Sequence, residues 1–189
     1  MVVFRSPHFD QAKYNVLPLD LIASKAKFSE EDVGQTDRVV FPALLVNFVG
    51  SHRNYPVMRD GTIALIPEES VPLEYPVGSR VVRTEQEVIL LDATSIPGAS
   101  GAPVFLWPGP RVKKQTFNVG GTPPLLLGIM HGFYTATPRD LLTIQVATPR
   151  QMYQENSGIA IAFPSWRLAE ILDYPELRTR MLQLSQSAQ

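Results

Sequence analysis

The sequence predicts an all-β domain of short antiparallel strands, arranged either as a sandwich or as a barrel. Proline supplies 17 of the 189 residues, about 9%, against a usual share of roughly 5%. Prolines this frequent interrupt long helices. Runs of β-branched and aromatic residues recur at short intervals, with no helical segments alternating between them. That pattern favours antiparallel sheets over alternating β and α units.

Eight segments have the composition of strands. Pro42 separates the first two. In the third, Asp60-Gly61 is a turn signal between two short apolar runs, so we expect a hairpin there. The fourth, 80–92, has a polar middle that is typical of a hairpin or of a strand with a solvated centre. The predicted strands are 38–41, 43–49, 56–66, 80–92, 102–107, 125–133, 141–147 and 158–163.

Two helices are predicted after the last strand. Ser165 is an N-cap candidate for a helix over 166–172, in which the leucines and the isoleucine share one face. Pro175 suits the first position of a terminal helix that reaches Leu182. The segment 108–124 is rich in proline and glycine and is expected to be a surface loop, with its basic cluster in solvent rather than in a binding patch.

Charge and cysteine content exclude several functions. Lys plus Arg is 17 and Asp plus Glu is 18, a net charge of −1. This balance argues against nucleic-acid binding and against a polybasic membrane surface. With no cysteine, disulfides, thiolate zinc sites and cysteine nucleophiles are excluded. No His/Asp/Glu cluster has ligand spacing, since His8-x-Asp10 is too common a pairing, so we expect no metal and no organic cofactor.

Neither membrane insertion nor export is expected. The longest apolar stretches fall short of the roughly 18 residues that a membrane span needs. The first residues have no basic segment followed by a long apolar run, so no signal peptide is predicted and the default compartment is the cytoplasm.

The segment 95–105, SIPGASGAPVF, carries the most chemical information. Its glycines allow tight or positive-φ turns on both sides of Ser100. In such a turn the amides of Gly98 and Ser100 can converge on one point beside the Ser100 hydroxyl. A nucleophile beside two converging donors is the arrangement that acyl transfer requires. The alternative is an ordinary Gly/Ser turn in a generic all-β domain.

A nucleophile elbow, G-x-S-x-G, is a competing interpretation of the same residues. It requires glycine at position 102, where this chain has Ala102, and a helix directly after the serine. Pro103 and the strand-like residues that follow it exclude that helix.

The segment resembles the nucleophile motif G-D-S-G-G-P-V of the chymotrypsin/trypsin-like serine peptidases, with Ala99 and Ala102 as departures. Two further stretches support the resemblance: 125–132 is similar to the strand that lines the family's specificity pocket, and 156–165 is similar to its last strand. The segments 37–41 and 56–64 resemble the opening strands of the second barrel. The resemblance therefore covers about residues 14–172.

The resemblance implies a six-stranded antiparallel β-barrel, the second of the family's two barrels, with C-terminal helices and only a remnant of the first barrel. It divides the chain into a remnant and linker (1–36), the barrel (37–164) and C-terminal helices with a frayed tail (165–189). It makes Ser100 the nucleophile, places the oxyanion on the Gly98 and Ser100 amides, and assigns Thr94 and His131 to the specificity pocket. A neutral Thr94 predicts no strong preference for basic side chains.

The family's histidine and aspartate are not found in their expected contexts. The acid position falls on 13–15, where there is no acid, and Asp10 and Asp20 only flank it. His8 precedes both but lacks the expected T-A-x-H context. His52 is expected in a solvated loop. His131 is either a strand-end histidine bonded to its neighbours or a residue that contacts substrate.

Two explanations of this gap stay open: the chain is a fragment of a longer enzyme, or it is a shortened relative that does not cleave. The first makes it a serine endopeptidase domain acting on peptides or proteins through Ser100, with its base supplied from elsewhere. The second makes it an inactive module that binds a peptide or a partner protein. A partner is also expected on the face that a missing first barrel would expose.

Overall fold

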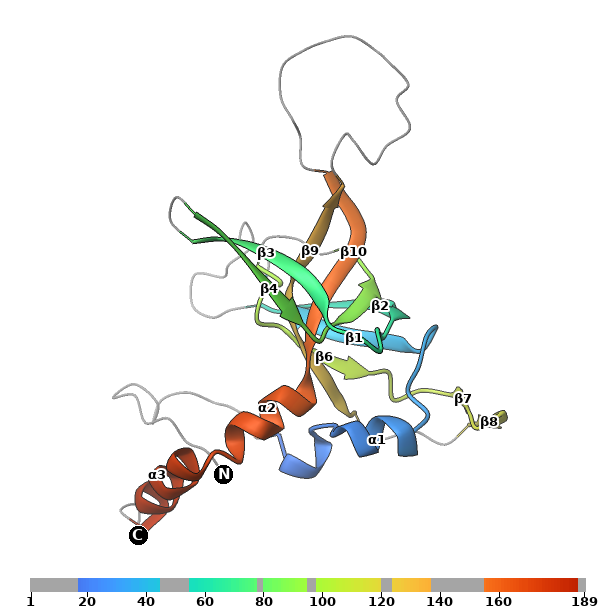
Figure 1. The fold of residues 1–189 in the computed structure, drawn as a ribbon. Coiled ribbons are helices and arrows are strands. Elements are labelled where there is room, and N and C mark those ends of the chain that lie inside the picture. The colour runs from blue at the N-terminus through green and yellow to red at the C-terminus, as the bar shows by residue number, and fades with distance from the viewer. Residues whose placement is uncertain are drawn as a thin grey trace, which may run out of the picture.

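The computed structural model describes residues 17–44, 55–77, 80–94, 98–119, 124–136 and 155–186. In these residues six strands close into an antiparallel barrel of order β1-β2-β5-β10-β9-β6 (Figure 1). The chain is mostly β, and the predicted six-stranded barrel is confirmed. The barrel strands are β1 (Arg38–Ala43), β2 (Val57–Leu65), β5 (Ile89–Asp92), β6 (Pro103–Leu106), β9 (Leu126–Ala136) and β10 (Glu155–Pro164).

Two separate hairpins accompany the barrel. One pairs β3 (Val71–Val77) with β4 (Arg80–Gln86), and the other pairs β7 (Arg111–Lys113) with β8 (Thr116–Asn118). The β3–β4 hairpin crosses the outside of the barrel (Figure 1). A small second core of Leu73, Val88 and Ile161 lies there.

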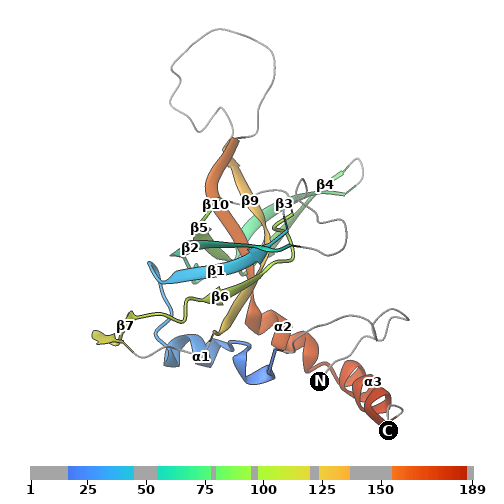
Figure 2. The ribbon, with the colours of Figure 1, turned by 180° about the vertical axis from the view of Figure 1, so that it is seen from behind.

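Three α-helices lie outside the barrel: α1 (Lys25–Glu30), α2 (Ser165–Leu172) and α3 (Pro175–Gln186). The two predicted C-terminal helices are confirmed, and the second extends beyond Leu182. Seen from behind, α1 and α2 lie at the same end of the barrel (Figure 2). Their contact is edge-on packing of Phe28 against Trp166, with ring centroids 4.9 Å apart. In the part of the chain that the structure describes, no helix is long and apolar enough to cross a membrane.

The main core fills the barrel. Side chains at alternate positions of each strand point inward, as the twofold period of a strand requires. In β1 these are Val39, Phe41 and Ala43, each 2% exposed or less. The largest fully buried side chains from the other strands are Ile63, Ile89, Leu91, Leu106, Leu127 and Met130.

The hairpin predicted at Asp60-Gly61 is wrong, because both residues lie inside the continuous strand β2. Gly61 serves a different purpose there. A Cβ at this position would lie 2.5 Å from the Asp92 carbonyl oxygen and 2.7 Å from the Ala93 Cβ. Glycine is therefore required for the close approach of β2 to β5, not for a turn.

Three other local predictions change. Ser165 is the first residue of α2 rather than its cap, and its buried hydroxyl donates to the Ala23 carbonyl oxygen at 2.7 Å. The predicted surface loop 108–124 contains the β7–β8 hairpin. Within its basic cluster Arg111 is buried, while Lys114 is exposed as expected. The strand predicted over 141–147, and most of the one over 43–49, lie outside the described residues.

Candidate functional site

The Ser100 turn connects β5 to β6 and is held by backbone hydrogen bonds to two other barrel strands. On one side the Leu44 amide, just after β1, donates to the Gly98 carbonyl oxygen at 3.3 Å. On the other side the Gly101 amide donates to the Met130 carbonyl oxygen in β9, at 2.8 Å. The turn is therefore fixed to the rim of the barrel at both ends.

Two glycines and one buried alanine shape the turn. Gly98 has φ of 100° and Gly101 has φ of 85°, values that side-chain-bearing residues rarely adopt. Between them Ala99 is fully buried in the main core, whereas Ser100 is exposed. The buried Ala99 side chain therefore anchors the turn, and the Ser100 hydroxyl next to it lies at the surface.

Only some of the amides in the turn have a hydrogen-bond acceptor among the described residues. Gly101 donates to Met130, and Ala102 donates to the Ala99 carbonyl oxygen at 3.0 Å. For the amides of Gly98 and Ser100, the described residues provide no acceptor. An oxyanion hole likewise uses main-chain donors near a nucleophile, so these two amides are the ones that could serve as its donors.

The Ser100 hydroxyl is not bonded to a histidine ring in the described part of the chain. It donates to the carbonyl oxygen of His131 at 3.1 Å. The His131 ring packs against Phe163, with ring centroids 4.7 Å apart, and burial lowers the pKa of His131, which favours the neutral ring. His131 therefore meets the predicted nucleophile through its main chain.

The remaining predicted site residues lie farther from the Ser100 hydroxyl than the main chain of His131 does, or outside the described residues. Thr94 is exposed and lies two residues beyond the end of β5. Asp20 is exposed in a 3-10 turn (Leu19–Leu21) that precedes the bridge between Ile22 and Leu126. That bridge is five residues along β9 from His131, roughly 16 Å, so the structure does not bring Asp20 to Ser100. His8, Asp10 and His52 lie outside the described residues.

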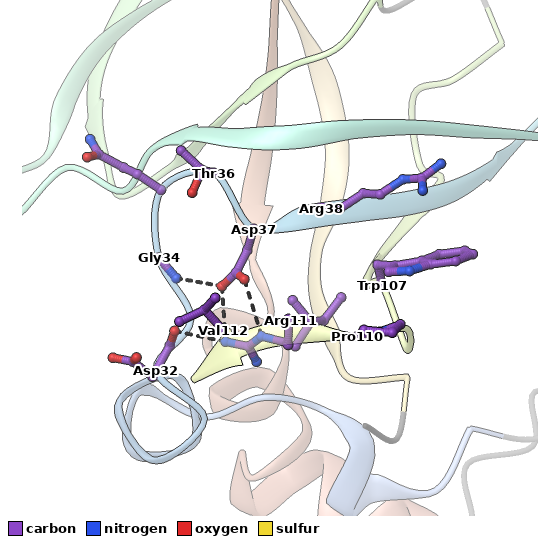
Figure 3. Close-up of a pocket in the computed structure, with 11 residues that line it drawn as sticks. Asp32, Gly34, Thr36, Asp37, Arg38, Trp107, Pro110, Arg111 and Val112 are labelled. Carbon is purple, nitrogen blue, oxygen red and sulfur yellow. Dashed lines mark hydrogen bonds and ion pairs between the residues drawn. The ribbon is translucent and has the colours of Figure 1, made fainter. Parts of the chain in front are cut away.

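A pocket of about 480 Å³ lies where β1 begins and β6 ends, away from the Ser100 turn (Figure 3). The polar groups in it hold parts of the fold together. The Asp37 carboxylate points at the Arg111 guanidinium, 3.1 Å away, and also accepts from the Gly34 amide at 3.0 Å. Arg111 further donates to the carbonyl oxygens of Glu31 and Asp32, and so clamps the β7–β8 hairpin to the end of α1.

The burial of Arg111 differs from the solvated segment that its composition predicts, because Lys113 and Lys114 follow it closely in the sequence. Its position one residue before Val112 gives no signal of burial, because the partners that bury it are distant in the sequence. Among the described residues there is no group of three or more His, Cys, Asp or Glu side chains that would hold a metal ion.

Comparison of the chain with protein-family models, with curated proteins and with solved structures finds no match. The resemblance to the trypsin-like peptidases therefore stays a prediction that depends on the residues of the turn and on the strands around it.

Proposed function

We propose that this chain is a serine-bearing barrel of a trypsin-like endopeptidase and that it acts on peptide bonds through Ser100. Acylation would begin with attack of the Ser100 oxygen on a peptide carbonyl carbon, while the Gly98 and Ser100 amides hold the oxyanion. The serine proton passes to a base and from it to the leaving amine. Water then hydrolyses the ester and restores the hydroxyl.

The observation that carries this proposal is the exposed Ser100 hydroxyl beside two amides without an acceptor in the described residues. Ala99 and the Gly101 amide anchor the loop, so a ligand bound by the Gly98 and Ser100 amides would not have to displace either anchor.

A base from outside the described residues is expected, because Ser100 donates to a carbonyl oxygen there and not to an imidazole. His8 and His52 are the two candidates within the chain. A base from further sequence or from a partner chain is the other source. Without any base, an oxyanion hole and substrate binding retain roughly 10³- to 10⁴-fold catalysis over water.

A second candidate function is a peptide-binding module that does not cleave. The bond from Ser100 to the His131 carbonyl favours it, since a hydroxyl in this state keeps its proton and is a weak nucleophile. In this case the same turn would bind a peptide carbonyl oxygen without forming a covalent bond.

A fluorophosphonate probe separates the two functions. The peptidase proposal predicts covalent labelling of the chain, detected as a mass increase on the peptide that contains Ser100, and no labelling of Ser100→Ala. Loss of labelling in His8→Ala or in His52→Ala would identify the base.

An unlabelled wild-type chain that still binds peptides would favour the second function. A chain that is neither labelled nor binds peptides would refute both. Ser157→Ala is the matched control, because Ser157 is a serine outside the turn and its loss should leave labelling unchanged.

A further inference from the structure

Arg59 has an unusual position for an arginine, on the inner side of a barrel strand. In the β1–β2 register it lies directly opposite Phe41, and residues directly opposite each other share a face of the sheet. Phe41 is fully buried in the barrel core. The Arg59 side chain is accordingly half-buried, whereas its neighbours Met58 and Asp60 lie on the outer face and are exposed.

The Arg59 guanidinium has no partner among the residues that the structure describes. Its Nε is buried and has no acceptor, and no carboxylate there forms an ion pair with the side chain. The nearest acid on its own strand, Asp60, is bound instead to Arg38 at 2.8 Å. Buried donors without an acceptor are uncommon and costly in folded proteins.

Arg111 shows what this barrel does with a structural arginine. Its side chain is 8% exposed and is bound to the Asp37 carboxylate and to two carbonyl oxygens. Arg59 has no comparable set of acceptors. Arg111 also keeps one buried nitrogen, Nη1, without an acceptor, but its other nitrogens are paired, whereas no nitrogen of Arg59 is bonded to a described residue. The Arg59 guanidinium can therefore take its acceptor from a ligand.

The strands on both sides of Arg59 lead to the Ser100 turn. On the β1 side, Leu44 is three residues beyond Phe41, roughly 10 Å along the strand, and its amide binds the Gly98 carbonyl oxygen. On the β5 side, Ala93 lies against Gly61, two residues from Arg59, and is followed by Thr94. The register therefore places Arg59 between two strands whose ends lead into the Ser100 turn, and an arginine side chain spans about 7 Å.

We propose that Arg59 makes the Ser100 site select peptides with an acidic side chain, whose carboxylate pairs with the Arg59 guanidinium. The inference rests on the proposed function, since it assigns a substrate class to that site. A planar guanidinium binds a carboxylate through two parallel hydrogen bonds, which a neutral amide does not reproduce. Thr94 is uncharged and does not compete for the arginine.

The test compares two fluorescent peptides, Ala-Ala-Glu-Ala and Ala-Ala-Gln-Ala, which differ only in the charge of one side chain. Their affinities for the full chain are measured by fluorescence anisotropy, with Ser100→Ala to prevent turnover. We expect the Glu peptide to bind roughly 10- to 100-fold more tightly than the Gln peptide. In Arg59→Met this preference should disappear, with the affinity for the Gln peptide unchanged.

Arg178→Met is the matched control for net charge. Arg178 is an exposed arginine on α3 that pairs with Asp173, so its loss should leave the preference intact. A second measurement addresses folding. The substitution Arg59→Met breaks no interaction with a described residue, so its melting temperature should equal or exceed that of the wild type. A clear decrease would contradict the claim that Arg59 is unpaired.

The outcomes separate the two proposals. Equal binding of both peptides, or a Glu preference that survives in Arg59→Met, overturns the assignment of Arg59 and leaves the proposed function standing. Failure of the wild-type chain both to bind either peptide and to react with the fluorophosphonate refutes the proposed function, and the assignment of Arg59 with it.

Discussion

Replacing Gly61 by alanine should push β2 away from β5 and destabilise the barrel. The added Cβ would lie 2.5 Å from the Asp92 carbonyl oxygen and 2.7 Å from the Ala93 Cβ, where ordinary contacts are 3.4–4 Å. The obstacle is backbone and a short side chain, so neither can rotate away. Overpacking of this kind costs about 1–3 kcal/mol. In a domain of this size that corresponds to a decrease of about 2–12 °C in melting temperature.

The assay is urea unfolding followed by circular dichroism, with Gly132→Ala as the matched control. Gly132 is also a barrel glycine, in β9, but a Cβ there meets nothing within 4 Å. The control should be as stable as the wild type. If Gly61→Ala is as stable as the wild type, the close approach of β2 to β5 is wrong. The placement of Arg59 near Thr94, which depends on that approach, would then be wrong too.

Three further predictions concern the polar contacts. The Asp37 side chain is only 12% exposed, and Arg111→Met would leave its carboxylate without a cation. The free energy of unfolding in urea should then decrease by about 3 kcal/mol. A decrease below about 1 kcal/mol would contradict the role of Arg111 in holding the hairpin to α1. The pKa of Glu87 is lowered by its hydrogen bonds, first to Lys25 and then to Trp166. Its stabilisation is thus present above the ordinary value of 4.5 and is lost as the pH falls through the lowered pKa, so Glu87→Gln should flatten the loss of stability measured from about pH 7 to about pH 3. Burial lowers the pKa of His131 below its ordinary 6.5; the unfolded chain then binds more protons, and unfolding free energy should decrease as the pH falls through that range. His131→Gln should lack this decrease in urea unfolding measured against pH, and an unchanged profile would contradict it.

The barrel could be predicted because its strands carry their own signals. Alternating apolar residues and frequent breakers indicate short antiparallel strands, and the motif around Ser100 linked them to a six-stranded closure. The β3 strand was missed because Pro72 and Pro76 lie inside it. The structure accommodates them because β3 pairs only with β4, and the other edge of the strand needs no amide donors.

Positions that depend on a distant neighbour could not be predicted. Gly61 has the composition of a turn, and only its contact with Asp92 explains it as a strand residue. Arg111 stands beside two lysines in the sequence, yet Asp37, 74 residues away, makes it a buried clamp. The position of Arg59 on the inner face follows from strand register, which a single sequence does not specify at a residue of this type.

Hydrogen exchange of the turn amides, measured by NMR, tests for the oxyanion hole without requiring any activity. We expect the Gly101 amide, which is bound to the Met130 carbonyl oxygen at 2.8 Å, to exchange slowly. The amides of Gly98 and Ser100, for which the described residues offer no acceptor, should exchange near the rate of an open peptide. Protection of Gly98 and Ser100 equal to that of Gly101 would mean that these donors are already occupied, and the site would have no oxyanion hole.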